Sequence, residues 1–326
     1  MTKTRIQDLL TALTLEEKVS LLSGEDFWTL PAIDRLGMGK LRVTDGPNGA
    51  RGGGSLVGGV TAAAFPVGIS LGSTWDPELV QDVAGAIAQE VKSKSAHVAL
   101  APTVNIQRSV ANGRNFECYS EDPELSAQLT VAYVTGLQNQ GVSATLKHFV
   151  GNESEIERTT ISSEIDERSL RETYLRPFED AVKKANAWGI MSSYNQLNGV
   201  YTSENDWLLT AVLRQDWGYD GIVMSDWFGS HSTAESVNAG LDLEMPGATR
   251  DRGEKLVEAV KRGEVSETTL NDRVLAILRL MERTGALDDH SDFIELADDR
   301  PEHRALIRKA GAAGSVLLKN AGLLPL

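Results

Sequence analysis

The chain has 326 residues, of which 41% are apolar and 30 are glycine, an ordinary composition for a globular protein with a large core. The 46 acidic and 32 basic residues give a net charge of −14, which disfavours binding to a nucleic-acid backbone. No apolar run approaches the ~18 residues of a membrane helix. The N-terminus lacks a secretory apolar stretch, and the single Cys118 cannot form an internal disulfide. We therefore expect a cytoplasmic protein that binds neither nucleic acid nor a membrane.

Short apolar runs alternate along the chain with longer helical patterns. The runs lack strict alternation with polar residues, which is typical of strands buried on both faces of a parallel sheet. They are 41–44, 66–71, 97–104, 142–146, 188–192, 221–225 and 240–245. This rhythm favours a (β/α)8 TIM-like barrel, with a missing or irregular strand, over a doubly wound sheet.

Capping residues mark where several of the predicted helices begin. The N-cap residues are Thr14 (in a capping box with Glu17), Asp76, Asp122, Asp166 and Ser266. Pro177 should break or kink the helix that begins after Asp166, because proline removes a backbone donor. Gly285 should end the helix that begins after Ser266.

Charged and polar side chains follow five of the predicted strands, where the active sites of barrels lie. The segments are 45–51, 105–117, 147–148, 193–195 and 226–227. Carboxylates, lysine, histidine and arginine can each bridge neighbouring hydroxyls of a sugar, and a tryptophan can cover the apolar face of its ring. The set therefore indicates a polyol-binding site. Asp226 ends an apolar strand, and we expect nearby arginine, lysine and protonated histidine to hold it ionised, as a nucleophilic carboxylate requires.

Four segments resemble glycoside hydrolase family 3: VTDGPNG at 43–49, GRNFECYSEDP at 113–123, KHFVGNE at 147–153 and VMSDW at 223–227. The resemblance covers nearly the whole chain and implies that residues 1–310 form a TIM-like catalytic barrel. It implies a retaining, exo-acting β-glycosidase, with β-glucosidase as the leading expectation, that hydrolyses terminal non-reducing β-D-glycosyl residues by double displacement. The substrate would be a small oligosaccharide or an aryl or alkyl β-glycoside, with no cofactor.

The resemblance also assigns roles to individual residues. Asp226 is the expected nucleophile. The expected sugar-binding residues are Asp45, Arg51, Arg114, Lys147, His148, Arg158, Met191, Tyr194 and Trp227. Arg108 is an alternative to Arg114, which is preferred because it follows the family's GR. Met191 and Tyr194 have an alternative interpretation as core residues, and Arg51 and Arg158 as loop charges in simple ion pairs.

A retaining glycosidase needs a second carboxyl group as acid/base. In two-domain members of the family this group comes from a second α/β domain, and residues 311–326 resemble the start of the connection to it. Single-domain members use an Asp–His dyad on the loop after the KH pair, but here residues 149–160 contain neither. We expect a second domain or a complementary chain to supply the acid/base, with Glu153, Glu155 and Glu157 as alternatives. Homo-oligomerisation is left open.

Two other functions fit some of these residues: a lyase or aldolase with a Schiff base on Lys147, and a sugar-binding barrel without catalysis. The glycine-rich stretch 52–59 is interpreted as a mobile loop over the barrel mouth, since it lacks the GK[ST] ending of a phosphate loop. Cys118 is interpreted as a small buried residue. The five histidines show no metal-binding spacing, so no metal is expected.

Overall fold

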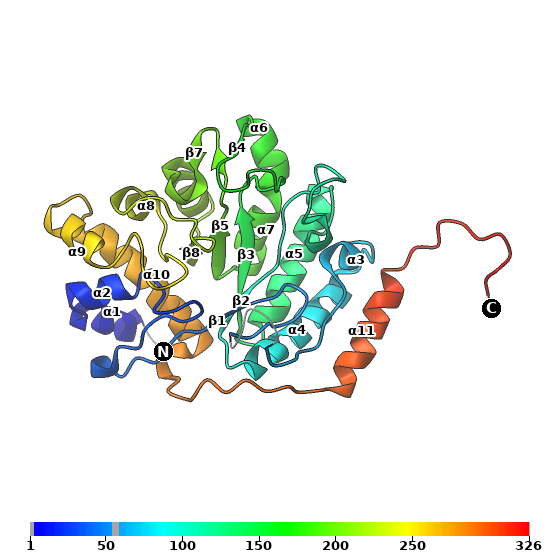
Figure 1. The fold of residues 1–326 in the computed structure, drawn as a ribbon, viewed down its shortest axis with the longest axis horizontal. Coiled ribbons are helices and arrows are strands. Elements are labelled where there is room, and N and C mark those ends of the chain that lie inside the picture. Colours follow the sequence, from blue (N-terminus) through cyan, green and yellow to red (C-terminus); the bar gives the residue numbers. More distant parts are fainter. Residues whose placement is uncertain (1–2, 54–58, 326) are drawn as a thin grey trace.

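The computed structural model describes residues 3–53 and 59–325 (Figure 1). Residues 54–58, within the stretch interpreted as a mobile mouth loop, lie outside the described residues. The strands are β1 (Val43–Asp45), β2 (Val98–Leu100), β3 (Ser143–Phe149), β4 (Ser162–Ser163), β5 (Gly189–Ser192), β6 (Gln196–Leu197), β7 (Val200–Tyr201) and β8 (Ile222–Met224). The α-helices are α1 (Lys3–Ala12), α2 (Leu15–Ser20), α3 (Gly68–Gly72), α4 (Pro77–Ser93), α5 (Pro123–Gln138), α6 (Glu167–Ser169), α7 (Arg176–Ala185), α8 (Ala234–Ala239), α9 (Glu254–Lys261), α10 (Glu267–Thr284) and α11 (Pro301–Ala313).

The central sheet has the order β1-β2-β3-β5-β8, and every neighbouring pair is parallel. Single parallel bridges from Met224 to Leu243 and from Ser23 to Glu244 extend the pairing beyond β8. Within the described residues the named strands do not close into a ring. Strands in chain order, joined across helices, confirm the predicted TIM-like barrel with an irregular part.

Two of the predicted strands are wrong or incomplete. Residues 66–71 form no strand; instead helix α3 begins at Gly68, and Gly68 and Gly72 pack against the backbone carbonyls of Glu117 and Tyr119. A Cβ at either glycine would lie 2.1 Å from those oxygens. The segment 240–245 occupies a strand position but pairs only through single bridges. There the Asp242 carboxylate, not a backbone carbonyl, accepts one bond from the Val223 N–H at 2.7 Å.

The predicted caps are confirmed. Thr14 and Glu17 form the capping box of α2, and the N-cap side chains of α4, α5, α6 and α10 each accept a bond from a backbone N–H of the first turn. Gly285 ends α10 in the left-handed conformation. The helix after Asp166 changes to a π-helix, η3 (Leu170–Tyr174), before α7 begins, as expected for a chain interrupted at Pro177.

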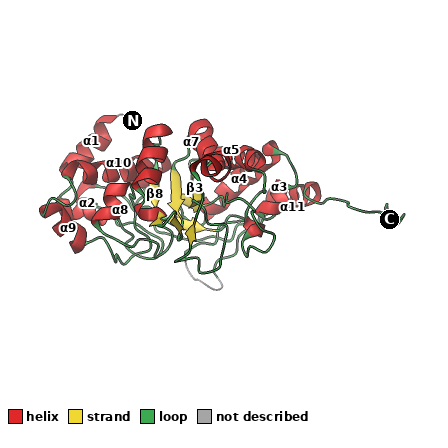
Figure 2. Cartoon of the chain, turned by 90° about the horizontal axis from the view of Figure 1, so that it is seen from above, coloured by secondary structure: helices red, strands yellow, loops and turns green. Residues whose placement is uncertain are grey.

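Helices surround the sheet, and the loops gather along one edge of the molecule (Figure 2). All seven residues of β3 are buried, as predicted for a strand covered on both faces. After α10 the chain crosses beneath the sheet to α11, which packs against α4 (Figure 1). Arg42 forms an ion pair with Glu295 of this crossing segment. Helix α11 continues past residue 310, the predicted end of the barrel domain. Within the described residues no helix combines the length and apolar character needed to cross a bilayer.

Candidate active site

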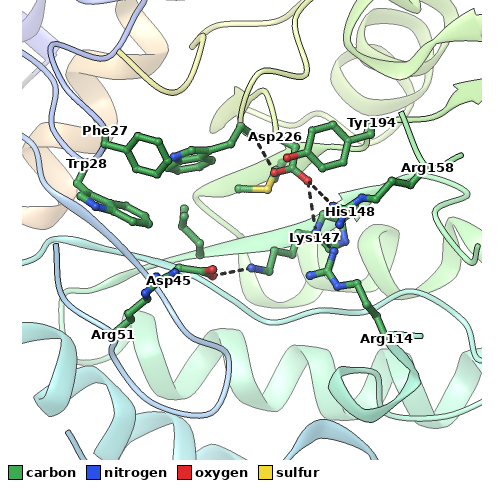
Figure 3. Close-up of a pocket in the computed structure, with 13 residues that line it drawn as sticks. Phe27, Trp28, Asp45, Arg51, Arg114, Lys147, His148, Arg158, Tyr194 and Asp226 are labelled. Atoms are coloured by element: carbon green, nitrogen blue, oxygen red, sulfur yellow. Dashed lines mark hydrogen bonds and ion pairs between the residues drawn. The ribbon is translucent and has the colours of Figure 1, made fainter. Parts of the chain in front are cut away.

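A cavity of about 280 Å³ lies at the carboxyl ends of the parallel strands (Figure 3). The structure brings all ten predicted site residues to its wall: Asp45, Arg51, Arg114, Lys147, His148, Arg158, Met191, Tyr194, Asp226 and Trp227. Some of these residues lie on strands β1, β3 and β5 themselves. The others lie on the loops that follow β1, β2, β3, β5 and β8. Residues separated by up to 182 positions in the chain therefore meet at one site, while the roles assigned to them stay predictions.

Asp226 follows β8 and is 8% exposed. Its Oδ1 accepts a bond from the backbone N–H of Trp227 at 2.7 Å, and its Oδ2 lies 3.6 Å from His148 Nε2 and 4.0 Å from Arg158 Nη2. The Tyr194 hydroxyl points toward the carboxylate (Figure 3). Burial raises the pKa of Asp226 above its usual value, although Lys147 and the Trp227 N–H act in the opposite direction. Desolvation thus has a larger effect on the pKa of this carboxylate than the neighbouring cations, which act to keep it ionised.

Lys147 and Asp45 form an ion pair on the opposite wall of the cavity. Lys147 Nζ donates to Asp45 Oδ1 at 2.7 Å, and the lysine side chain is 5% exposed. Burial alone would raise the pKa of Asp45, but the Lys147 ammonium overrides it and holds that pKa below its usual value. The pair therefore presents a fixed donor and a fixed acceptor, which suits two adjacent hydroxyls of a sugar ring.

His148 and Arg114 form a second polar group. Arg114 Nη1 lies 3.2 Å from His148 Nε2, while its Nε and Nη2 donate to the Glu117 carboxylate at 3.0 and 2.9 Å. Burial lowers the pKa of His148 far below its usual value, and the charges of Arg114, Lys147 and Arg158 lower it further. The expectation of a protonated histidine was therefore wrong: the surrounding cations and the lack of solvent favour the neutral imidazole.

Aromatic residues form the remaining wall. The Arg158 guanidinium lies over the Tyr194 ring, 4.5 Å from its centroid, and Trp227 contacts Trp28 and Phe27 with centroids 5.4 and 6.1 Å away. The cavity is also lined by Phe27, Trp28 and Leu100, which the sequence did not predict as site residues. The adjacent aromatic pair Phe27–Trp28 is the signal that the sequence offered, but both rings also pack in or against the hydrophobic core, so this signal did not distinguish a cavity wall from core packing.

The alternatives kept open by the sequence lie elsewhere. Arg108 is exposed and lines a neighbouring cavity of about 770 Å³, so of Arg108 and Arg114 it is Arg114 that lines this site. Glu153 and Glu155 line that same neighbouring cavity, and Glu157 is exposed. Glu155 pairs with Arg158 at 3.1 Å.

Cys118 is buried, and burial raises the pKa of its thiol to about 12, which agrees with a structural residue rather than a nucleophile.

The curated relatives of this chain are longer proteins. It is 66% identical to a protein of Rhizobium radiobacter named "Beta-glucosidase" over 321 residues, which is 98% of this chain and 39% of that protein. It is 48% identical to "Beta-glucosidase B" of Emericella nidulans, covering 99% of this chain and 38% of the relative. The chain therefore spans about two fifths of the length of these relatives.

Solved structures share the fold. A β-glucosidase of Kluyveromyces marxianus in complex with glucose matches 98% of this chain and 40% of its own, with a TM-score of 0.93 and 41% identity. β-Glucosidase 3B of Thermotoga neapolitana in complex with α-D-glucose matches 99% of this chain and 48% of its own, with a TM-score of 0.92 and 39% identity. Residues 40–280 match the family described as "Glycosyl hydrolase family 3 N terminal domain". This match covers most of the chain, and with the shared fold it shows that the protein belongs to glycoside hydrolase family 3.

Proposed function

We propose that this chain is the nucleophile-bearing barrel of a retaining β-glucosidase that acts on terminal non-reducing β-D-glucosyl residues. The observation that carries the proposal is Asp226, a buried carboxylate at a strand end that faces a small cavity lined by cations and aromatic rings. Membership of the family, relatives named β-glucosidase and solved relatives in complex with glucose support it.

The cavity has bonding capacity suited to a sugar. Among the described residues, the buried atoms Trp227 Nε1 and Arg158 Nε have no hydrogen-bond partner, although such atoms are nearly always paired in proteins. Lys147 and Asp45 offer a donor and an acceptor opposite Asp226, and Trp227 offers an apolar face. A pyranose ring held between these walls would have its anomeric carbon directed at Asp226.

The proposed reaction begins with attack by Asp226. Its carboxylate oxygen forms a bond to the anomeric carbon while the glycosidic C–O bond breaks, and the aglycone oxygen leaves with the electron pair. Arg158 and Tyr194 lie beside the carboxylate and would orient it, and the neutral imidazole of His148 would accept a bond from a sugar hydroxyl. Water then attacks the anomeric carbon: its oxygen forms the new C–O bond, the bond to Asp226 breaks and leaves the carboxylate free, and the acid/base group takes the proton of the water.

We propose that the acid/base comes from outside the described residues, in a second domain of the full-length protein. Besides Asp226, the one carboxylate that the described residues contribute to this cavity is Asp45, which is held by Lys147. Glu153, Glu155 and Glu157 are absent from the lining of the described cavity. A second domain in the longer relatives is consistent with the share of their length that this chain covers.

The Schiff-base lyase receives no support from the site. Lys147 lies 2.7 Å from Asp45, the geometry of an ammonium held by a carboxylate, whereas Schiff-base chemistry requires a neutral, unpaired amine near a carbonyl. A sugar-binding barrel without catalysis would use the same cavity as the proposed glucosidase. Formation of a covalent bond to Asp226 distinguishes the two functions.

A mechanism-based inactivator tests the proposal. 2,4-Dinitrophenyl 2-deoxy-2-fluoro-β-glucoside carries a leaving group that departs without protonation, and we expect a mass adduct on the peptide that contains Asp226. The variant Asp226→Asn should form none, while Asp216→Asn, an exposed aspartate on the same stretch of chain, should react like the wild type. Labelling of another carboxylate would overturn the assignment, and glucose binding without any adduct would favour the non-catalytic barrel.

A further inference from the structure

Asn105 lies behind the cavity, after β2, and is 3% exposed. Its carboxamide contacts both the backbone and the side chain of His148. Oδ1 accepts a bond from the His148 backbone N–H at 2.8 Å, and Nδ2 donates to the His148 carbonyl at 3.0 Å. Nδ2 also lies 3.3 Å from the Glu153 carboxylate. Asn105 is absent from the lining of the cavity, whereas its partner His148 is part of that lining, so Asn105 reaches the cavity through His148.

The backbone of His148 fixes which end of this carboxamide is oxygen. A backbone N–H can only donate and a carbonyl can only accept, so the atom facing the N–H must be Oδ1 and the atom facing the carbonyl must be Nδ2. The same Oδ1 lies 3.1 Å from His148 Nδ1. Because an amide oxygen only accepts, Nδ1 must carry the proton.

The other ring nitrogen has the opposite neighbour. His148 Nε2 lies 3.2 Å from Arg114 Nη1, and a guanidinium can only donate. A neutral imidazole protonated at Nδ1 carries a lone pair at Nε2, which satisfies this contact. The surrounding cations and burial lower the pKa of His148, which agrees with the neutral ring.

We infer that Asn105 is a positioning residue, which holds His148 as the Nδ1–H tautomer so that Nε2 acts as a hydrogen-bond acceptor in the cavity. The other tautomer would place an N–H at Nε2, 3.6 Å from Asp226 Oδ2. That separation is too long for a hydrogen bond, but the positive end of the N–H would still stabilise the carboxylate electrostatically and weaken it as a nucleophile. The contact between Nε2 and Arg114 would then join two donors. This consequence for the nucleophile rests on the proposed function, whereas the tautomer does not.

Nitrogen NMR tests the tautomer directly. Long-range ¹H–¹⁵N spectra of the full chain labelled at histidine distinguish the protonated ring nitrogen from the bare one, and the variant His148→Gln assigns the signals. We expect His148 to carry its proton at Nδ1. His97 is an internal control of the opposite kind, because its Nδ1 accepts from the Arg42 backbone N–H at 3.1 Å and its Nε2 faces Asp289. A wild-type His148 protonated at Nε2 would overturn the inference.

The variant Asn105→Ala tests the cause. It removes the acceptor, so we expect His148 to lose its preference for Nδ1–H while His97 is unchanged. Asn238→Ala, at an exposed asparagine, is the matched control. If Asn105→Ala does not fold, Asn105→Asp keeps an acceptor oxygen, and its His148 should stay protonated at Nδ1. Retention of the wild-type tautomer in a folded Asn105→Ala, or loss of the Nδ1 proton in Asn105→Asp, would refute the role.

A kinetic readout follows where the proposed function holds. The rate of adduct formation at Asp226 in Asn105→Ala should fall about tenfold, a difference of about 1.4 kcal/mol in the barrier. The NMR measurement of the tautomer does not depend on this rate. If the proposed function is wrong, no adduct forms at Asp226 in the wild type, but the NMR spectrum still reports the tautomer of His148.

Discussion

Glu153 is a buried carboxyl group whose ionisation should control the stability of the barrel. It is 8% exposed, and its Oε1 accepts from Asn105 Nδ2 at 3.3 Å. Burial raises the pKa of Glu153 from 4.5 to about 7, in spite of the Asn105 donor. The variant Glu153→Gln keeps the shape and an acceptor oxygen but cannot ionise. Comparing it with the wild type therefore isolates the cost of burying this charge.

The magnitude follows from the two pKa values. A carboxyl that binds its proton more tightly in the folded chain than in the unfolded chain stabilises the fold below pH 4.5, and this stabilisation is lost as the pH rises through 7. A pKa difference of one corresponds to about 1.4 kcal/mol of free energy. The rise from 4.5 to about 7 therefore corresponds to a total loss of about 3 kcal/mol in the free energy of unfolding. Relative to Glu153→Gln, the wild type should therefore become less stable between pH 5 and pH 8.

Urea denaturation at several pH values measures this difference. The free energy of unfolding of the wild type minus that of Glu153→Gln should fall by most of those 3 kcal/mol across this range, and other titrating groups cancel in the subtraction. Glu157→Gln, at an exposed residue of the same loop, is the control and should show no such trend. A difference that stays constant within 1 kcal/mol would refute the reasoning, because it would mean that Glu153 is solvated or better paired than the structure indicates.

Three further predictions concern the site and the fold. Lys147→Ala removes a buried charge-assisted hydrogen bond worth roughly 1.5–3 kcal/mol. It should therefore lower kcat/KM for an aryl glucoside about tenfold to a hundredfold, and an unchanged value in a folded variant would place Lys147 outside the subsite. Because general acid catalysis contributes ~10²–10⁴-fold, the chain alone should react with dinitrophenyl glucoside far faster than with an alkyl glucoside. Similar rates would show that it carries its own acid. Thr14→Ala should lower the free energy of unfolding by about 1 kcal/mol, since it removes the cap of α2, and equal denaturation curves would contradict this.

Most of the polar site could be located from the sequence because its residues lie at or just after strand ends, and the family resemblance selected the individual residues, including Arg158 and Met191, which lie outside those segments. The carboxyl ends of parallel strands meet at one face of a barrel, so Asp45, Lys147 and Asp226 were brought together by topology alone. Phe27 and Trp28 precede β1 and reach the cavity through the packing of the loop after α2, which has no strand-end signal. Asn105 was among the polar residues after its strand, but only its contacts distinguish it from a sugar-binding residue.

The sequence by itself predicted the barrel, the helix starts and the polar residues at the strand ends, because apolar runs, capping residues and strand-end motifs are local signals. Tertiary structure alone decided the rest. It replaced the strand predicted at 66–71 by helix α3 at Gly68–Gly72, whose two end glycines lie against the distant backbone of Glu117 and Tyr119. It also decided the charge states, since the pKa of Asp226 is raised and that of His148 is lowered by burial and by neighbours that lie far away in the chain. Desolvation and charge depend on three-dimensional distance, which no spacing in the sequence specifies.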